Sequence, residues 1–147
     1  MEVIRVGKND GDIFTYILVN LIDNSDKKGG LPPTSYIEKF LDDDRTYLLA
    51  AIMDGAVIGY TLAYRFPSLY AVEFLGYLYD IEVTPVHRRK GVGRLLVETL
   101  ICRMKSDGVK ELWLGTAVDN EEGHALFRTT GAIKSGETFN DYTYYLA

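Results

Sequence analysis

The chain has 147 residues and a formal net charge of −5, with 47% hydrophobic and 25% charged residues. This size and balance are typical of a globular protein, so we expect one domain over residues 1–147. The apolar runs are too short for a membrane span, the first residues have no signal-peptide pattern, and the acidic charge argues against a nucleic-acid partner.

The N-terminal third predicts one strand and two helices. Residues 2–6 alternate as a short strand, and apolar residues recur at helical spacing over 13–21. A loop rich in glycine and proline is expected over 26–33, followed by a second short helix over 35–42.

The middle of the chain predicts three strands. Residues 46–53 and 56–66 are strand-like runs joined by Asp54-Gly55, a strong hairpin signal. Residues 70–83 form a longer strand that we expect to bend near Gly76, because glycine inside a strand often marks a bulge.

The rest of the chain predicts two helices and three strands. A helix over 91–105 has a continuous apolar stripe, and a strand is expected over 111–118. A helix over 121–130 then precedes two short strands, over 132–135 and 141–146. The order βααβββαβαββ predicts an α/β fold, in which a mixed sheet has helices on both faces.

The most informative segment joins the strand that ends at Val83 to the helix that begins at Gly91. The first amides of a helix have no intrahelical acceptor and carry partial positive charge. Glycines let an anion approach that backbone closely, and basic side chains surround it. The segment, which predicts a pyrophosphate-binding cradle, reads Arg88-Arg89-Lys90-Gly91-Val92-Gly93-Arg94.

Other phosphate motifs fit this segment poorly. A P-loop requires G-x-x-x-x-G-K-[ST], which is absent from the chain. A dinucleotide fingerprint requires a third glycine where Leu96 stands. From the residues alone, the alternative is a glycine-rich helix start with a solvated basic face.

The cradle segment resembles motif A of the GNAT superfamily of acyl-CoA-dependent N-acetyltransferases, [RQ]-x-x-G-x-[GA]. Arg88, Gly91 and Gly93 occupy its fixed positions. A second family pattern, N-x-x-A-x-x-L-Y followed by a glycine, is similar to the stretch from Asn120 to Phe127. The resemblance extends over nearly the whole chain. It implies a GNAT-like, mostly antiparallel sheet whose central strands splay at the cofactor site.

Within the superfamily, the chain most resembles the aminoglycoside 3-N-acetyltransferases that modify gentamicin. Those proteins carry Y-x-Y-D on an aromatic-rich strand, as residues 77–80 do here. The resemblance therefore implies acetyl-CoA as the acyl donor and a small cationic amine as the acceptor.

The resemblance also implies where acetyl-CoA would bind. Backbone groups of Ile81 and Val83 would hold the pantetheine arm, and Asn120 would bond the cofactor where the strands splay. The implied cofactor-binding set is Ile81, Val83, Arg88, Arg89, Lys90, Gly91, Val92, Gly93, Arg94 and Asn120. Phe127 departs from the family, because many members have a tyrosine there that protonates the leaving thiolate.

Two carboxylates and one histidine are the catalytic candidates. The resemblance places Asp80 near the point where the acceptor amine would meet the thioester, which makes it the candidate base. Glu82 shares its face, because residues two apart on a strand point the same way. His124 is a candidate acid for the thiolate. The alternative for Asp80 is a structural carboxylate that bonds neighbouring backbone groups, and the alternative for His124 is an ordinary surface histidine.

Cysteine and histidine counts exclude other chemistry. A single cysteine, Cys102, excludes an intramolecular disulfide and a cysteine-based zinc cluster. Two histidines are too few for a histidine-rich metal site, so no metal is expected. A reducing, cytoplasmic setting is the simplest inference. We expect Cys102 to be a buried structural thiol rather than a nucleophile.

Acidic residues around the predicted site favour a cationic acceptor. Glu121 and Glu122 add to this charge, and the substrate-binding residues that we expect are Asp80, Glu82, Asp119 and Asp141. We predict direct acetyl transfer from acetyl-CoA to a polycationic amine in a ternary complex, with an aminoglycoside as the first-choice acceptor. Transfer to a polyamine or a protein amine stays open, as do a CoA-binding regulatory module, a domain that binds nothing, and a homodimer through a sheet edge.

Overall fold

The computed structural model describes residues 1–23 and 29–146, so the predicted loop over 26–33 lies partly outside it. Within the described residues, no helix combines the length and the apolar character that a membrane span needs. The elements, in chain order, are β1 (Glu2–Arg5), α1 (Gly11–Asn20), α2 (Thr34–Asp42), β2 (Thr46–Met53), β3 (Ala56–Pro67), β4 (Phe74–Val83), the 3₁₀ turn η1 (Pro85–His87), α3 (Val92–Ser106), β5 (Val109–Trp113) and α4 (Glu121–Thr129).

The strands form one mixed sheet in the order β1-β2-β3-β4-β5. The first three pairings are antiparallel, and β4 pairs with β5 in parallel. Asp54 and Gly55 turn the hairpin between β2 and β3 with φ values of 51° and 76°. Positive φ at both residues is the geometry of a type I′ turn, which confirms the predicted hairpin.

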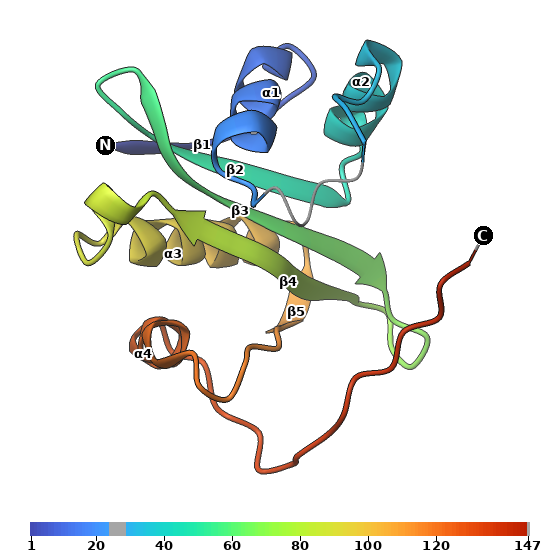
Figure 1. Ribbon diagram of the computed structural model, residues 1–147. Helices are drawn as coiled ribbons and strands as arrows, with labels where there is room; N and C mark the ends of the chain where they lie inside the picture. The colour runs from blue at the N-terminus through green and yellow to red at the C-terminus, as the bar shows by residue number, and fades with distance from the viewer. Residues whose placement is uncertain (24–28, 147) are drawn as a thin grey trace.

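Helices cover both faces of the sheet, as Figure 1 shows. Helices α1 and α2 pack on one face, where Phe14 and Phe40 meet edge to face at 5.4 Å. Helix α3 packs on the other face through Leu96 and Leu100, which are fully buried. This arrangement confirms the predicted α/β fold, in which a mixed sheet has helices on both faces.

We predicted a bend near Gly76, and the irregularities of β4 lie on either side of this residue, not at it. Gly76 pairs regularly with Arg65 of β3 and with Leu112 of β5. A Cβ atom at this position would lie 3.0 Å from the sulfur of Met104 and 3.2 Å from Leu112 Cδ1. The glycine therefore lets α3 approach the sheet closely, and it does not interrupt the ladder.

The β4–β5 register shifts between Phe74 and Leu75, and the irregularity in the β3–β4 ladder lies at Tyr79. Leu62 of β3 is opposite Asp80, and the next residue, Ala63, is opposite Leu78, so Tyr79 has no opposite residue. This is a β-bulge, which leaves the extra residue unpaired and increases the local twist. The bulge lies immediately before the candidate base.

Cys102 is exposed on α3, which contradicts the buried thiol that we predicted. The buried stripe of the helix includes Val97, Leu100 and Met104. At about 100° per residue, Cys102 lies on the opposite side from Leu100 and Met104. The periodicity of the apolar residues was correct, but Cys102 is not part of it.

The two strands predicted over 132–135 and 141–146 are absent. Residues 132–146, named here the C-terminal arm, have no regular secondary structure and run outside the layered body of the fold (Figure 1). The side chains of Tyr142, Tyr144, Tyr145 and Leu146 are between 88% and 91% exposed. A strand forms only where its backbone finds a ladder partner, and the described part of this chain offers the arm none.

Candidate active site

A groove of about 850 Å³ opens where β4 and β5 separate. The two strands pair only from Phe74 to Tyr77, because β5 ends at Trp113 instead of continuing to the predicted residue 118. The part of β4 after Tyr77 therefore has an edge that is not paired with β5 and that faces the groove. The lining residues are 78–83 of β4, 87–89 and 91–94 at the start of α3, 114–116 after β5, and 120–123 and 125–127 around α4.

The turn between β4 and α3 presents backbone amides to one end of the groove. Arg89 and Gly91 both have left-handed conformations, with φ values of 60° and 83°. Gly91 is the N-cap of α3, and no side chain caps the amides that follow it. A Cβ atom on Gly91 would meet nothing within 4 Å, so the conformation, not crowding, favours glycine. Helix amides in this arrangement suit a pyrophosphate.

Gly93 has a second structural reason beside the anion approach that the sequence suggested. A Cβ atom on Gly93 would lie 3.3 Å from Leu126 Cδ2 and 3.9 Å from Val83 Cγ2. The missing side chain therefore lets the first turn of α3 approach α4 and β4. That approach brings two walls of the groove together.

Arg88 and Glu82 form an ion pair at the end of β4. Arg88 Nη2 lies 2.6 Å from Glu82 Oε1, and Arg88 Nε donates to the Val83 carbonyl at 3.0 Å. The Glu82 carboxylate is therefore already balanced by a cation, which separates its chemistry from that of Asp80. The carbonyl of Val83, one of the backbone groups predicted to hold pantetheine, is engaged by Arg88.

Two further arginines of the cradle also have glutamate partners. Arg89 Nη2 lies 3.5 Å from Glu122 Oε1 of α4, and Arg94 Nε donates to Glu98 Oε1 at 2.8 Å. Both pairs are solvent-exposed, and exposed ion pairs are weak enough for a bound phosphate to compete with them. Lys90 is exposed and does not line the groove.

Asp80 lines the groove and is held by a buried phenol. Tyr60, which is 3% exposed, donates from its hydroxyl to Asp80 Oδ2 at 2.5 Å. The hydroxyl of Thr61 donates to the Asp80 carbonyl at 2.8 Å. A carboxylate has about four acceptor positions. One phenol donor therefore orients Asp80 and leaves it able to accept a proton.

Five aromatic side chains on β3, β4 and β5 form a series of ring contacts that begins at Tyr79, the residue before Asp80. Adjacent rings lie 5.3 to 6.4 Å apart between centroids. This aromatic cluster consists of Tyr64, Phe66, Tyr77, Tyr79 and Trp113. Burial raises the pKa of Tyr64, and the neighbouring phenols Tyr79 and Tyr36 act in the same direction, so this phenol stays neutral near pH 7.

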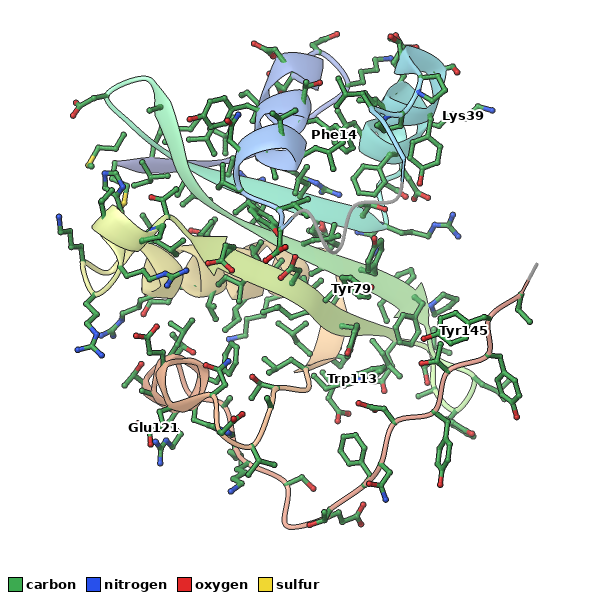
Figure 2. All side chains as sticks on the ribbon, viewed as in Figure 1. Phe14, Lys39, Tyr79, Trp113, Glu121 and Tyr145 are labelled. Atoms are coloured by element: carbon green, nitrogen blue, oxygen red, sulfur yellow. The ribbon has the colours of Figure 1, made fainter. Side chains whose placement is uncertain are left out.

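Sequence analysis did not identify the aromatic cluster, which reaches the groove through Tyr79. Tyr77 and Tyr79 entered only as letters of the Y-x-Y-D pattern, although Tyr79 is 67% exposed and lines the groove. The spacing of Tyr64 and Phe66 on the neighbouring strand is the signal that could have revealed it. Residues two apart on one strand share a face, and they can contact the residues opposite them on the adjacent strand. Figure 2 labels Tyr79 and Trp113, which mark two members of the cluster.

Asn120 and His87 line the groove and also support its walls. Asn120 caps α4, since its Oδ1 accepts from the Gly123 amide at 3.1 Å, and its Nδ2 donates to Thr116 Oγ1 at 2.8 Å. His87 Nδ1 lies 2.8 Å from Thr84 Oγ1, a contact that shapes the turn before the cradle.

Three other predicted site residues do not line the groove. His124 Nε2 lies 3.1 Å from the Ala117 carbonyl. Asp119 is exposed in the loop before α4, and Asp141 is exposed on the C-terminal arm. Phe127 lines the groove and is 9% exposed. Among the described residues, no group of histidine, cysteine and acidic side chains could hold a metal ion.

Comparisons with known proteins identify relatives of this chain. The model of the Acetyltransferase (GNAT) family matches residues 16–132. The [Ribosomal protein bS18]-alanine N-acetyltransferase of Escherichia coli (strain K12) is 39% identical over 54 residues, which is 37% of this chain and 36% of that protein. The match thus spans about a third of that curated relative.

Solved structures share the fold over almost the whole chain. An aminoglycoside acetyltransferase from an uncultured soil metagenomic sample, in complex with sisomicin, has a TM-score of 0.86 at 20% identity, covering 99% of this chain and 96% of that one. The aminoglycoside N-acetyltransferase AAC(6')-Iy in complex with CoA has a TM-score of 0.75 at 18% identity, covering 99% and 100%. The chain belongs to the GNAT family of acetyltransferases, which use acetyl-CoA as the acyl donor.

Proposed function

We propose that this protein transfers the acetyl group of acetyl-CoA to an amino group of a polycationic small molecule. An aminoglycoside is the first candidate, and the 3-N position is the proposed amine. The observation that carries the proposal is Asp80, a groove-lining carboxylate oriented by Tyr60 and preceded in the chain by Tyr79, which also lines the groove. A carboxylate beside aromatic rings suits an ammonium group on a sugar ring, since the rings attract cations and pack against apolar ring faces.

The cradle holds the donor in this proposal. Backbone amides from Arg89 to Arg94 bind the pyrophosphate, and the free edge of β4 at Ile81 is available to the pantetheine arm. Acetyl-CoA supplies the thioester carbonyl that the amine attacks. These contacts use backbone groups, so donor binding depends little on which side chains surround the cradle.

Asp80 acts on the acceptor. It takes a proton from the substrate ammonium, directly or through one water, and the resulting neutral amine attacks the thioester carbonyl. A backbone amide of the bulged part of β4 stabilises the oxyanion. The carbon–sulfur bond then breaks, and CoA leaves as a thiolate. Because Phe127 has no proton to give and His124 does not line the groove, we assign the thiolate proton to solvent.

A protein N-terminal amine is the second candidate acceptor. It is favoured by the 54-residue match to the bS18-alanine N-acetyltransferase. A polyamine is a third acceptor that suits the same carboxylate. The groove-lining ring of Tyr79 favours the aminoglycoside, because a linear polyamine has no ring to pack against it.

A thiol-release assay with acetyl-CoA separates these acceptors. Gentamicin, spermidine and a peptide with N-terminal alanine are compared at matched concentrations. We expect the highest kcat/KM for gentamicin, and mass spectrometry of the product should place the acetyl group on the 3-amino position. Preference for the peptide would transfer the proposal to a protein acceptor. CoA binding without thiol release from any amine would indicate a regulatory module.

A further inference from the structure

Arg88 differs from the other arginines of the cradle in its ion-pair partner. Among the described ion pairs, those of Arg89 and Arg94 join the cradle to helix α4 and to the next turn of α3. Arg88 instead contacts Glu82 on β4, the strand that also carries Asp80. Both members of the pair line the groove, and their side chains are 44% and 40% exposed. This ion pair therefore links the cradle to the strand of the candidate base.

The guanidinium of Arg88 is held by a carboxylate and a carbonyl. Its Nη2 donates to Glu82 Oε1 at 2.6 Å, and its Nε donates to the Val83 carbonyl at 3.0 Å. The ion pair is partly exposed, so water screens it and it is weak. A pyrophosphate on the neighbouring cradle amides carries more negative charge than a carboxylate, and arginine binds phosphate oxygens in a bidentate manner. A bound donor therefore competes with Glu82 for Arg88.

The loss of Arg88 would change the charge that the groove presents on β4. Glu82 and Asp80 both line the groove, and alternate residues of a strand share a face. No second cation is paired with Glu82 among the described ion pairs. Once Arg88 turns to the donor, the Glu82 carboxylate is left unbalanced and can accept charge-assisted hydrogen bonds from an ammonium group.

We propose that donor binding releases Glu82 from Arg88 and so completes a second cation site beside Asp80. The site takes another ammonium group of a polycationic acceptor, so the acceptor binds more tightly to the donor complex than to the free protein. Linkage makes the effect reciprocal, because a bound acceptor that holds Glu82 leaves Arg88 to the donor. The role of Glu82 toward the acceptor rests on the proposed function, whereas the exchange of Arg88 between Glu82 and the donor does not.

A double-mutant cycle on CoA affinity tests the exchange without an acceptor. CoA is titrated calorimetrically into the unaltered protein, Glu82→Gln, Arg88→Gln and the double variant. Because Glu82→Gln frees Arg88 for the pyrophosphate, CoA should bind about fivefold more tightly to this variant. In the Arg88→Gln background, the same change should have a much smaller effect. A CoA affinity that Glu82→Gln leaves unchanged, lowers, or raises equally in both backgrounds would overturn the proposal.

Glu121→Gln is the matched control for the loss of a negative charge from the groove. Glu121, labelled in Figure 2, also lines the groove and takes part in none of the described ion pairs. Its substitution should change CoA affinity by the same small factor with and without Arg88. A dependence on Arg88 as large as that of Glu82→Gln would also overturn the exchange. Circular dichroism spectra verify that every variant is folded.

Cation titrations test the release of Glu82 for the acceptor. Gentamicin and spermidine are titrated separately into the free protein and into protein saturated with CoA, which has no acetyl group to transfer. We expect gentamicin to bind about fivefold more tightly to the CoA complex. Most of this gain should be lost in Glu82→Gln and kept in Glu121→Gln, which separates the release from simple attraction to the charge of CoA.

The outcomes of these titrations distinguish the release of Glu82 from the proposed function. A gain that survives in Glu82→Gln, or no gain with either cation, would overturn the release. A gain confined to spermidine would support the release and would count against the aminoglycoside as the acceptor.

Discussion

The two ends of the groove are built in different ways. The cradle end uses backbone amides and a left-handed glycine within one continuous stretch, residues 84–94. The acceptor end combines Asp80 and Tyr79 of β4, which line the groove, with Tyr60 of β3, which donates to Asp80. The cradle therefore depends on local backbone conformation, and the acceptor end depends on how strands pair.

This difference predicts separable responses to substitution. A change at the cradle should weaken CoA binding and leave the chemistry of bound substrates nearly intact. A change at the acceptor end should slow transfer and leave CoA affinity nearly intact. Four substitutions test this separation, in order of decreasing effect.

Asp80→Asn should have the largest effect. It keeps the size of the side chain but removes the proposed base, so kcat should fall by about 10²–10⁴-fold. Calorimetry should show unchanged CoA affinity. The acidic limb of the pH–rate profile should disappear, because deprotonation of the base no longer limits the rate. The control Glu82→Gln alters a carboxylate paired with Arg88 and should lower kcat much less. A raised KM with normal kcat would instead make Asp80 only an anchor for the cation.

Gly91→Val should weaken CoA binding. A β-branched residue at a φ of 83° is strained by roughly 1–3 kcal/mol. If the backbone of the cradle shifts to relieve this strain, CoA affinity should fall by about 5- to 150-fold. The kcat at saturating acetyl-CoA should change little. Gly91→Asn is the matched control, because asparagine tolerates this conformation and its Cβ would meet open space. Normal CoA affinity in a folded Gly91→Val protein would remove the cradle from the donor site.

Tyr60→Phe should have a smaller effect than Asp80→Asn. The ring stays packed, but the hydroxyl that donates to Asp80 Oδ2 is lost. A hydrogen bond to a charged group contributes about 1.5–3 kcal/mol, and only part of this acts in the transition state, so kcat should fall by about tenfold. CoA affinity should not change. An unaltered kcat would show that the phenol does not position the base.

Cys102→Ala should have almost no effect. The thiol is exposed on α3 and does not line the groove, so direct transfer does not involve it. Steady-state kinetics should show a sequential pattern in both proteins. Ping-pong kinetics together with an acetyl adduct on Cys102 would contradict direct transfer and would indicate a covalent acetyl-enzyme intermediate.

Several features could be predicted from the sequence, because they depend on residues close together in the chain. The Asp54-Gly55 turn, the apolar stripe of α3 and the strand–turn–helix around Gly91 are all present in the structure. Each follows from local conformational preference and from the 3.6-residue helical period, which need no knowledge of distant residues. The resemblance to the GNAT superfamily depended on the same local segments.

The remaining features were decided only by tertiary structure. The β3–β4 bulge is at Tyr79, three residues from Gly76, because the register between the two strands depends on both of them. Arg88 donates to Glu82, and Tyr60 donates to Asp80, although Tyr60 lies 20 positions earlier in the chain. The C-terminal arm alternates like a strand, yet a ladder requires a second backbone beside it. Sequence periodicity determined which residues of the arm share a face, whereas the presence of a partner decides whether that face becomes part of a sheet.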